Sequence, residues 1–569
     1  MKKNLLLTLA LCLLAQGGMA QTPKWVEKAK RAVFSIVTYD KNDKILNTGN
    51  GFFATEDGIA LSDCSLFKGA QRAMIIDSEG REMPVSALLG ANDMYDVIKF
   101  RVSTTDKKVA ALPLASSAPM VGAEVYLLPY STQKDRSCTQ GKITAVSKLA
   151  EKYAYYTLSL PLKDKLVSCP LMTADGQVFG LAQKSSGKDS AAICYAADAT
   201  FAFAQAINAL SMSDATLQNI GIKKGLPDTE EQALIFLYMA SSQTTPEEYK
   251  VLLDDYIRQY PNSADGYIRR ANNRIYLAKE DAGFASAAAD MEQALKVSQN
   301  KDDVHYNFAK MIYAYQLNKP DKTYQDWTFN KALEQVRSAE AINPQPVYQQ
   351  LEGDILFAKQ DYAGALVCYE KVNTSNLASA ATYFNTAKTK ELMKADSKEV
   401  LALMDSCLAR CIKPLTADAA PYLLERAQMY MNTEQFRLAM LDYDAYYDAV
   451  NGQVNDVFYF YREQAAFKAK QFQRALDDIA KAIELNQKDL TYRAEQAVVN
   501  LRVGRYDTAV KVLTEAVKLD PKYAEAYRLL GICQLQQKKN AEACTNFSKA
   551  KELGDPNVEE LIKKHCNNK

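Results

Sequence analysis

Short apolar runs that alternate with polar residues occupy the first third of the chain, from about residue 25 to residue 205. Turn-forming pairs such as Asp57-Gly58 and Asp175-Gly176 separate these runs. Many short strands with regular turn signals are typical of a β-barrel or a β-sandwich. A proline-bearing stretch, residues 112–119, divides this part into two similar pieces. The pattern therefore predicts an all-β domain over residues 25–210.

From about residue 229 the apolar positions recur with a helical period, and the sequence repeats itself. Ala475, Ala509 and Ala543 are 34 residues apart, which is the period of the tetratricopeptide repeat (TPR). Small residues in this repeat let paired helices cross closely, and larger ones fill the gaps. The packing positions predicted in this way are Gly353, Ala365, Ala427, Ala439, Ala475, Ala482, Ala509, Ala516, Gly531, Ala543, Phe547 and Ala550. We expect a linker over residues 211–228. Residues 229–569 are then an all-α TPR solenoid of about nine helix pairs with a C-terminal capping helix.

Residues 1–20 have the pattern of a secretory signal peptide. A basic start, Lys2-Lys3, precedes an apolar run that is short for a membrane span, and a small-x-small site lies before Gln21. We therefore expect an exported protein, located in the periplasm or at the exterior of a bacterial cell. No later stretch has the roughly 20 consecutive apolar residues of a transmembrane helix.

The balance of charged side chains argues against nucleic acid as a partner. The chain has 69 basic and 68 acidic side chains, a formal net charge of +1, whereas a nucleic-acid surface needs a basic stripe. Only two histidines occur, His305 and His565, and both fall in the helical part. We find no P-loop and no Gly-x-Gly-x-x-Gly fingerprint, so we predict no cofactor and no metal.

Three segments of the β part resemble the HtrA/Deg type of trypsin-like serine protease. Residues 49–58 are similar to the first-barrel signature of that family, and residues 96–99 to the segment that carries the triad aspartate. Residues 170–180 are similar to the stretch that follows the nucleophile. The resemblance implies a double β-barrel, with the solenoid attached to it.

The catalytic positions depart from this family. The histidine of the family falls on Ser65 and its nucleophile on Val167, so Asp96 is the one triad residue retained. Serine needs a base to accept its proton, and residues 1–304 contain no histidine to serve as one. Losing triad members leaves only about 10³–10⁴-fold acceleration over water. The resemblance therefore implies a catalytically inactive domain, a pseudoprotease.

Two alternatives remain. An active serine- or cysteine-type endopeptidase, with the TPR part recruiting substrate, would lose activity on mutation of Cys169 or Ser168. The cysteine form would use Lys163 or Lys165 as its base. A sugar-binding accessory protein would present exposed tryptophans, and the chain has only two, Trp25 and Trp327.

The chain has 11 cysteines, and ten remain if Cys12 is removed with the signal peptide. An even number in an oxidising compartment permits disulfides, whose connectivity the sequence does not fix. We expect Cys64 and Cys169 as one candidate pair because both flank the degenerate cleft. Cys138 and Cys194 are a second candidate pair. Cys407 and Cys411 lie four residues apart on one helix face and are expected to pack without bonding.

These observations combine into one expectation. The chain is an exported scaffold or adaptor whose TPR groove binds a protein or peptide partner on its concave face. The inactive barrel domain would hold a peptide by strand addition beside its former cleft.

Overall fold

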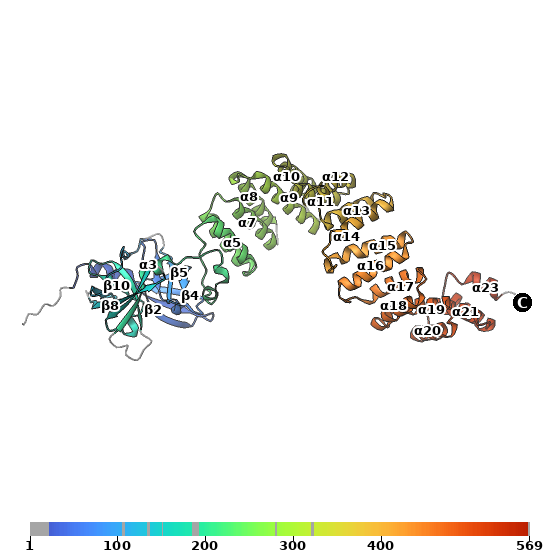
Figure 1. Cartoon of the computed structure of the whole chain (residues 1–569), viewed down its shortest axis with the longest axis horizontal. Helices are drawn as coiled ribbons and strands as arrows, with labels where there is room; N and C mark the ends of the chain where they lie inside the picture. Colours follow the sequence, from blue (N-terminus) through green and yellow to red (C-terminus); the bar gives the residue numbers. More distant parts are fainter. Residues whose placement is uncertain are drawn as a thin grey trace, which may run out of the picture. The chain divides into compact units, whose positions relative to one another are not determined.

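The computed structural model describes residues 22–104, 108–133, 137–150, 152–184, 193–278, 281–319 and 324–566. The predicted signal peptide lies outside these residues. The chain divides into two compact units, one up to Gln299 and one from Asn300 onward. Figure 1 shows strands followed by helices, and this order confirms the predicted fold class.

The strands form two closed six-stranded barrels, with the orders β1-β2-β3-β6-β5-β4 and β10-β11-β12-β9-β8-β7. Residues 112–119, which the sequence analysis placed between two similar halves, lie between the last strand of the first barrel and the first strand of the second. The first barrel comprises β1 (Val33–Tyr39), β2 (Ile45–Phe53), β3 (Ile59–Ser62), β4 (Arg72–Ile76), β5 (Glu82–Asn92) and β6 (Val97–Val102). The second comprises β7 (Glu124–Leu127), β8 (Thr139–Leu149), β9 (Tyr153–Ser159), β10 (Pro170–Thr173), β11 (Val178–Lys184) and β12 (Ile193–Asp198).

Alternation along the strands separates the barrel interiors from the layer between the barrels. In β1, Phe34 and Ile36 belong to the core of the first barrel, while Val33 faces a cluster that it shares with residues of the second. Short helical turns precede β1, as α2 (Val26–Ala29) and η1 (Lys30–Ala32), and Val26 packs into this shared cluster. The two barrels thus have separate cores and one common contact layer.

The segment expected to be a linker packs against the first barrel. It carries η5 (Ser211–Ser213) and α4 (Ala215–Gln218), and it follows α3 (Ala199–Ala204). Leu217, Ile220 and Ile222 are buried in a core that also contains first-barrel residues and residues of the first two long helices. A bridge between Leu88 and Lys224 ties the segment to β5. The apolar side chains of residues 211–228 therefore make it part of a packed core, and the compact units separate at residue 300 instead.

Within each compact unit, consecutive helices of the helical part pack on their neighbours (Figure 1). Its helices are α5 (Glu230–Ser241), α6 (Pro246–Gln259), α7 (Ala264–Leu277), α8 (Asp281–Val297), α9 (Lys301–Asn318), α10 (Phe329–Ile342), α11 (Pro346–Ala358), α12 (Tyr362–Asn373), α13 (Ala380–Leu392), α14 (Ser397–Ala409), α15 (Ala420–Asn432), α16 (Phe436–Ala449), α17 (Asp456–Lys468), α18 (Phe472–Leu485), α19 (Leu490–Arg502), α20 (Tyr506–Leu519), α21 (Ala524–Gln536), α22 (Asn540–Glu552) and the terminal α23 (Glu559–His565). Among the described residues, none of these helices has the length and apolar character needed to span a bilayer.

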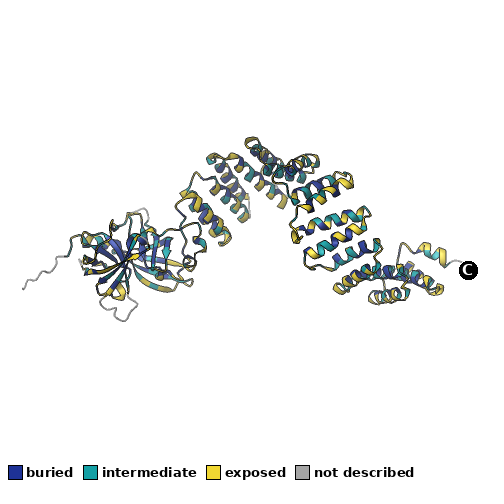
Figure 2. Cartoon of the chain, in the orientation of Figure 1, coloured by how far each residue is buried: buried dark blue, intermediate teal, exposed yellow. Residues whose placement is uncertain are grey.

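Small residues lie where paired helices cross, and the structure buries all twelve predicted packing positions. A Cβ added to Gly353 would lie 2.7 Å from the ring of Tyr369, so the crossing of α11 and α12 requires glycine. Gly531 faces the ring of Phe547 at an equally close crossing of α21 and α22. Figure 2 shows buried residues inside the barrels and along the helix contacts.

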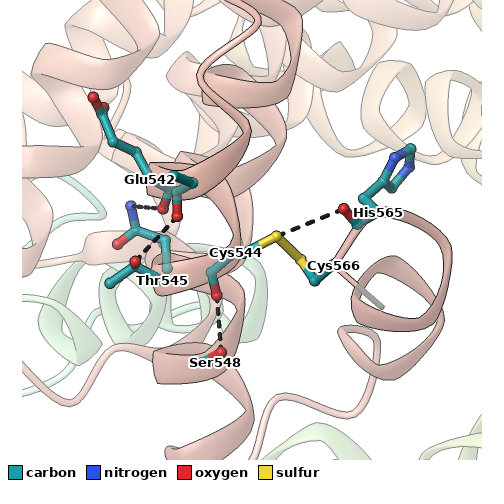
Figure 3. Close-up of a disulfide and its surroundings, with 8 residues drawn as sticks. Glu542, Cys544, Thr545, Ser548, His565 and Cys566 are labelled. Atoms are coloured by element: carbon teal, nitrogen blue, oxygen red, sulfur yellow. Dashed lines mark hydrogen bonds between the residues drawn. A yellow bond between two sulfur atoms is a disulfide. The ribbon is translucent and has the colours of Figure 1, made fainter. Parts of the chain in front are cut away.

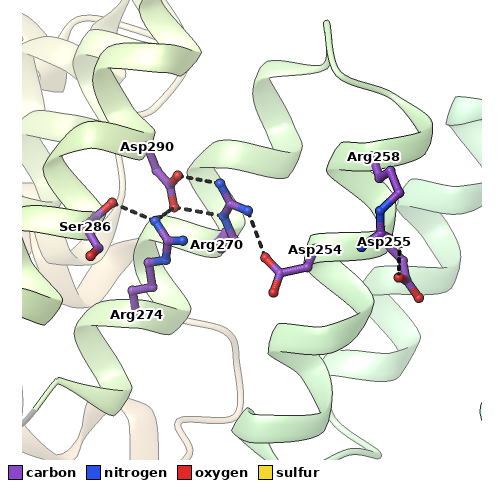
Figure 4. Close-up of polar contacts among 7 residues, drawn as sticks. All are labelled: Asp254, Asp255, Arg258, Arg270, Arg274, Ser286 and Asp290. Atoms are coloured by element: carbon purple, nitrogen blue, oxygen red, sulfur yellow. Dashed lines mark hydrogen bonds and ion pairs between the residues drawn. The ribbon is translucent and has the colours of Figure 1, made fainter.

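A repeated ion pair joins neighbouring helices in three places. In each case an arginine on the first helix of a pair bonds an aspartate on the second helix, and another aspartate on the helix before it. Figure 4 shows the first example, in which Arg270 lies 2.8 Å from Asp254 and 2.7 Å from Asp290. The other two triplets are Asp405–Arg426–Asp442 and Asp444–Arg462–Asp478. The arginine therefore fixes the packing of three successive helices.

We predict that Arg426→Met destabilises the helical part by about 3 kcal/mol, because it leaves the Asp442 carboxylate, 5% exposed, without its arginine. Urea unfolding followed by circular dichroism at 222 nm measures this loss. Arg258→Met is the matched control, since Arg258 is 75% exposed in its pair with Asp255 and should cost less than about 1 kcal/mol. Equal effects of the two variants would contradict a structural role for the triplets.

Candidate functional site

A cavity of about 380 Å³ lies at the junction of the two barrels. Its walls include all three positions that the resemblance assigned to the triad, Ser65, Asp96 and Val167. The other residues that line it are Thr48, Gly49, Asp63, Leu66, Asp164, Ser168, Gln183 and Lys184. The fold thus brings the degenerate positions together in one cleft.

Asp96 is held in the turn between β5 and β6, where its φ of 50° places it in the left-handed region. The amide of its neighbour Tyr95 donates to the Asn92 side chain at 3.0 Å. The Tyr95 carbonyl accepts a hydrogen bond of 2.6 Å from Gln183 of the second barrel. These bonds fix the turn from both sides, so the Asp96 carboxylate is positioned before any ligand arrives.

Ser65 occupies both oxygens of that carboxylate. Its backbone N–H donates to Asp96 Oδ1 at 2.6 Å, and its hydroxyl donates to Oδ2 at 2.9 Å. Ser65 lies in the short helix η2 (Cys64–Phe67), which Cys64 and Phe67 anchor in the first barrel. In a serine-protease triad the aspartate orients a histidine that accepts the serine proton. Here a hydroxyl with no basic nitrogen takes that place.

The turn before Val167 aims its carbonyls inward. The side-chain amide of Asn50 donates to the carbonyls of Lys165 and Val167, both at 2.9 Å. The amides of Leu166 and Ser168 donate to the carbonyls of Lys163 and Ala182, at 2.8 Å and 2.9 Å. An oxyanion hole needs N–H groups directed at the developing negative charge. In this turn the N–H groups instead donate to backbone carbonyls. Part of this bonding forms the short helix η3 (Asp164–Leu166).

Asp63 is a site residue that sequence reasoning missed. It follows β3 directly and is 3% exposed. Burial, with the negative charge of Asp96 as a second cause, raises the pKa of its carboxyl to about 8, although the nearby Ser168 hydroxyl lowers it somewhat. Apart from this contact between the two side chains, Asp63 Oδ1 and Ser168 Oγ make no hydrogen bond within the described residues. A carboxylate two positions before Ser65, on an otherwise apolar strand end, was the available signal.

The structure contradicts both predicted disulfides, because Cys64, Cys169, Cys138 and Cys194 are free thiols. Cys64 packs in the core of the first barrel, while Cys169 packs in the core of the second, so their sulfurs face different interiors. Cys194 also faces the second core, whereas Cys138 packs against the layer between the barrels. Burial raises the pKa of Cys169 to about 12, which leaves almost no thiolate for nucleophilic attack.

The disulfide that the structure contains joins Cys544 on α22 to Cys566, which follows α23, with 5.6 Å between their Cα atoms (Figure 3). Sequence spacing did not identify this pair, because the turn that folds α23 back onto α22 is a tertiary feature. Cys407 and Cys411 are free.

The other residues singled out from the sequence, two lysines and two tryptophans, do not form a catalytic or a sugar-binding arrangement. Lys163 and Lys165 are exposed, whereas Cys169 is buried, so the geometry of a cysteine–lysine pair is not present. Trp327 is buried against Phe308. The Trp25 ring packs on Tyr126, and its N–H donates to the Ala174 carbonyl at 3.0 Å.

Comparison with known proteins finds similarities for both parts of the chain. Residues 49–181 match the model of the trypsin-like peptidase domain, and residues 501–538 match that of the TPR repeat. A probable periplasmic serine endoprotease, DegP-like, from Halomonas elongata is 26% identical over 137 residues, 23% of this chain and 28% of that protein. Small glutamine-rich tetratricopeptide repeat-containing protein 2 from Mycosarcoma maydis is 34% identical over 98 residues, 17% of this chain and 28% of that protein. The chain thus spans less than a third of either relative.

Among solved structures, the active form of the Rv3671c protease from M. tuberculosis aligns with 33% of this chain and 85% of that chain. The identity is 18% and the TM-score is 0.28.

We predict that Asp63→Asn stabilises the protein increasingly as the pH rises from about 4 to about 8. In the unfolded chain an aspartate ionises near pH 3.9. In the folded chain Asp63 keeps its proton up to about pH 8, so the native protein with Asp63 loses stability across this interval. Thermal unfolding midpoints of both proteins from pH 4 to pH 9 measure the difference. A difference between the two proteins that does not change with pH would contradict a raised pKa of Asp63.

Proposed function

We propose that this protein is an exported scaffold or adaptor, in which the helical repeats bind a protein partner and the trypsin-like domain no longer hydrolyses peptides. The observation that carries this proposal is the bonding of Asp96. Both of its carboxylate oxygens accept from Ser65, at the position where the mechanism of the family needs a base.

The rest of the cleft supports the loss of hydrolysis. Val167 has no nucleophilic atom, and the adjacent Ser168 hydroxyl is buried with no histidine beside it. The carboxyl nearest to it, that of Asp63, keeps its own proton up to about pH 8. Asn50 holds the carbonyls of the turn where an oxyanion hole would need donors. Restoring activity would therefore require changes at the base, at the nucleophile and in the backbone of this turn.

The helical part supports partner binding. A cavity of about 450 Å³ on α5, α6 and α7 is lined by Arg269, Asn272, Asn273 and Tyr276 together with residues of the α5–α6 connection. Tyr276 is 78% exposed, and no hydrogen bond is made by Arg269 Nε within the described residues. Amide, guanidinium and phenol groups in one cavity can hydrogen-bond the backbone and side chains of a peptide, as TPR grooves do. We assign this cavity to the partner-binding groove.

Export is part of the proposal. The signal-like residues 1–20 and the Cys544–Cys566 disulfide both support an oxidising compartment, the periplasm or the cell exterior of a bacterium. The DegP-like relative is described as periplasmic, which agrees with this location.

Photo-crosslinking tests the binding function. We expect benzoylphenylalanine at Tyr276 of the full chain, expressed in cells of the source organism, to give a covalent adduct with one discrete protein. The same amino acid at Met120, 81% exposed on the barrel part, is the matched control and should give none. Equal adducts at the two positions, or none at Tyr276, would count against a binding groove there.

A further inference from the structure

The disulfide between Cys544 and Cys566 fastens the last helix, α23, to α22 (Figure 3). The two cysteines are 22 residues apart in the sequence, and each is partly exposed. The other eight cysteines within the described residues are free, and six of these eight are buried. The described part of the chain thus has its disulfide at an accessible position, where a reagent in solution can reach it.

Helix α23 has few other contacts that hold it in place. It has seven residues, and none of them is buried. An isolated helix shorter than about 12–15 residues is marginal in water, so its order depends on what it packs against. Leu561 and Ile562 are only partly buried where they pack on the cluster around Phe547. Lys551 and Glu559 form an ion pair of 3.2 Å, but each side chain is 58% exposed, and such pairs contribute little. The docking of α23 therefore depends mainly on the disulfide.

We propose that Cys544–Cys566 is a site of thiol–disulfide exchange with a dithiol oxidoreductase, and that its reduction releases α23 from α22. A thiolate of the dithiol attacks one sulfur of the disulfide, and the other cysteine leaves as a thiolate that takes up a proton. The second thiol of the dithiol then attacks the mixed disulfide and frees the first cysteine. The two cysteines together gain two electrons and two protons, and the dithiol is oxidised to a disulfide.

The sequence around Cys566 favours this exchange. Lys563 and Lys564 lie in the last turn of α23, two and three residues before it. Positive charge near a cysteine stabilises its thiolate, and a stabilised thiolate leaves faster. Cys544 lies between the uncharged Ala543 and Thr545. Cys566 is therefore the better leaving group, and the dithiol attacks the sulfur of Cys544.

Release of α23 uncovers apolar side chains of the last helix pair. Phe547 and Val558 are fully buried while the helix is docked, and Ile532 and Leu535 of α21 lie partly buried in the same cluster. The cross-link also restricts the open state of the segment that it closes, and for a loop of about this length the closed state gains roughly a hundredfold. The oxidised chain therefore keeps this end of the repeats covered, and the reduced chain exposes it.

Hydrogen–deuterium exchange of the full chain, measured by mass spectrometry of its peptides, tests the site. Free thiols are first blocked with N-ethylmaleimide, and the chain is then incubated without denaturant with thioredoxin, thioredoxin reductase and NADPH. We expect protection over residues 559–566 to fall at least about tenfold on reduction, while protection over α19 and α20 stays unchanged. Iodoacetamide should then label Cys544 and Cys566. In an unlabelled sample, diamide should restore the disulfide and the protection.

Two variants separate the disulfide from the rest of the chain. Cys566→Ser should show the fast exchange of the reduced chain, and reductant should change it no further. Cys411→Ser removes a partly exposed cysteine outside the disulfide and should match the natural chain in both redox states. Because Cys566 follows the paired helices, circular dichroism at 222 nm should be the same for all three proteins.

Three results would overturn this proposal. They are a disulfide that thioredoxin reduces only in denaturant, equal exchange over residues 559–566 in the two redox states, and a Cys566→Ser chain that exchanges as slowly as the oxidised protein. Failure of the crosslink at Tyr276 would leave the exchange site unaffected. The groove on α5–α7 belongs to the compact unit that ends at Gln299, and the disulfide belongs to the other unit.

Discussion

The cleft of the barrel domain depends on the carboxylate of Asp96, whose hydrogen-bond partner is Ser65, a residue that is not a base. Asp96 is partly buried in the wall of the cleft, and two hydrogen bonds hold its carboxylate in place. Ser65 donates both, with its amide and its hydroxyl, so the turn that holds Asp96 keeps its shape without histidine. Gln183 braces the same turn from the second barrel. The architecture of the cleft is thereby retained, while the group that would move a proton is absent.

The fold was largely predictable because it rests on local periodicity. Alternation of apolar residues predicted the barrels, and the 34-residue spacing of Ala475, Ala509 and Ala543 predicted the helix pairs. Such patterns record which face of each element is buried. The packing of residues 211–228 was not predictable. This segment has few apolar side chains, and they do not recur with the period of a helix or a strand. One of its partners is strand β5, which is distant in the sequence and which Leu88 joins to Lys224.

The site was predictable only as a set of positions. The order of the motifs predicted that Ser65, Asp96 and Val167 line one cleft. The directions of the side chains depend on tertiary structure, which the motifs do not give. Cys64 and Cys169 flank the cleft in sequence, yet each points into the core of its own barrel. Asp63 and Asn50 were missed for the same reason, because their roles come from atoms of other strands and turns. In the helical part, the arginine–aspartate triplets likewise join residues whose spacing varies, as Arg270–Asp290 and Arg426–Asp442 do.

The central claim is that the cleft has lost its nucleophile and base. Intact-mass spectrometry of the full chain after incubation with a fluorophosphonate tests this claim most directly, because that reagent phosphonylates only an activated serine. The account predicts an unchanged mass for the chain and the full expected adduct on trypsin treated in parallel. A stoichiometric adduct on this chain, mapped to Ser65 or Ser168, would contradict it.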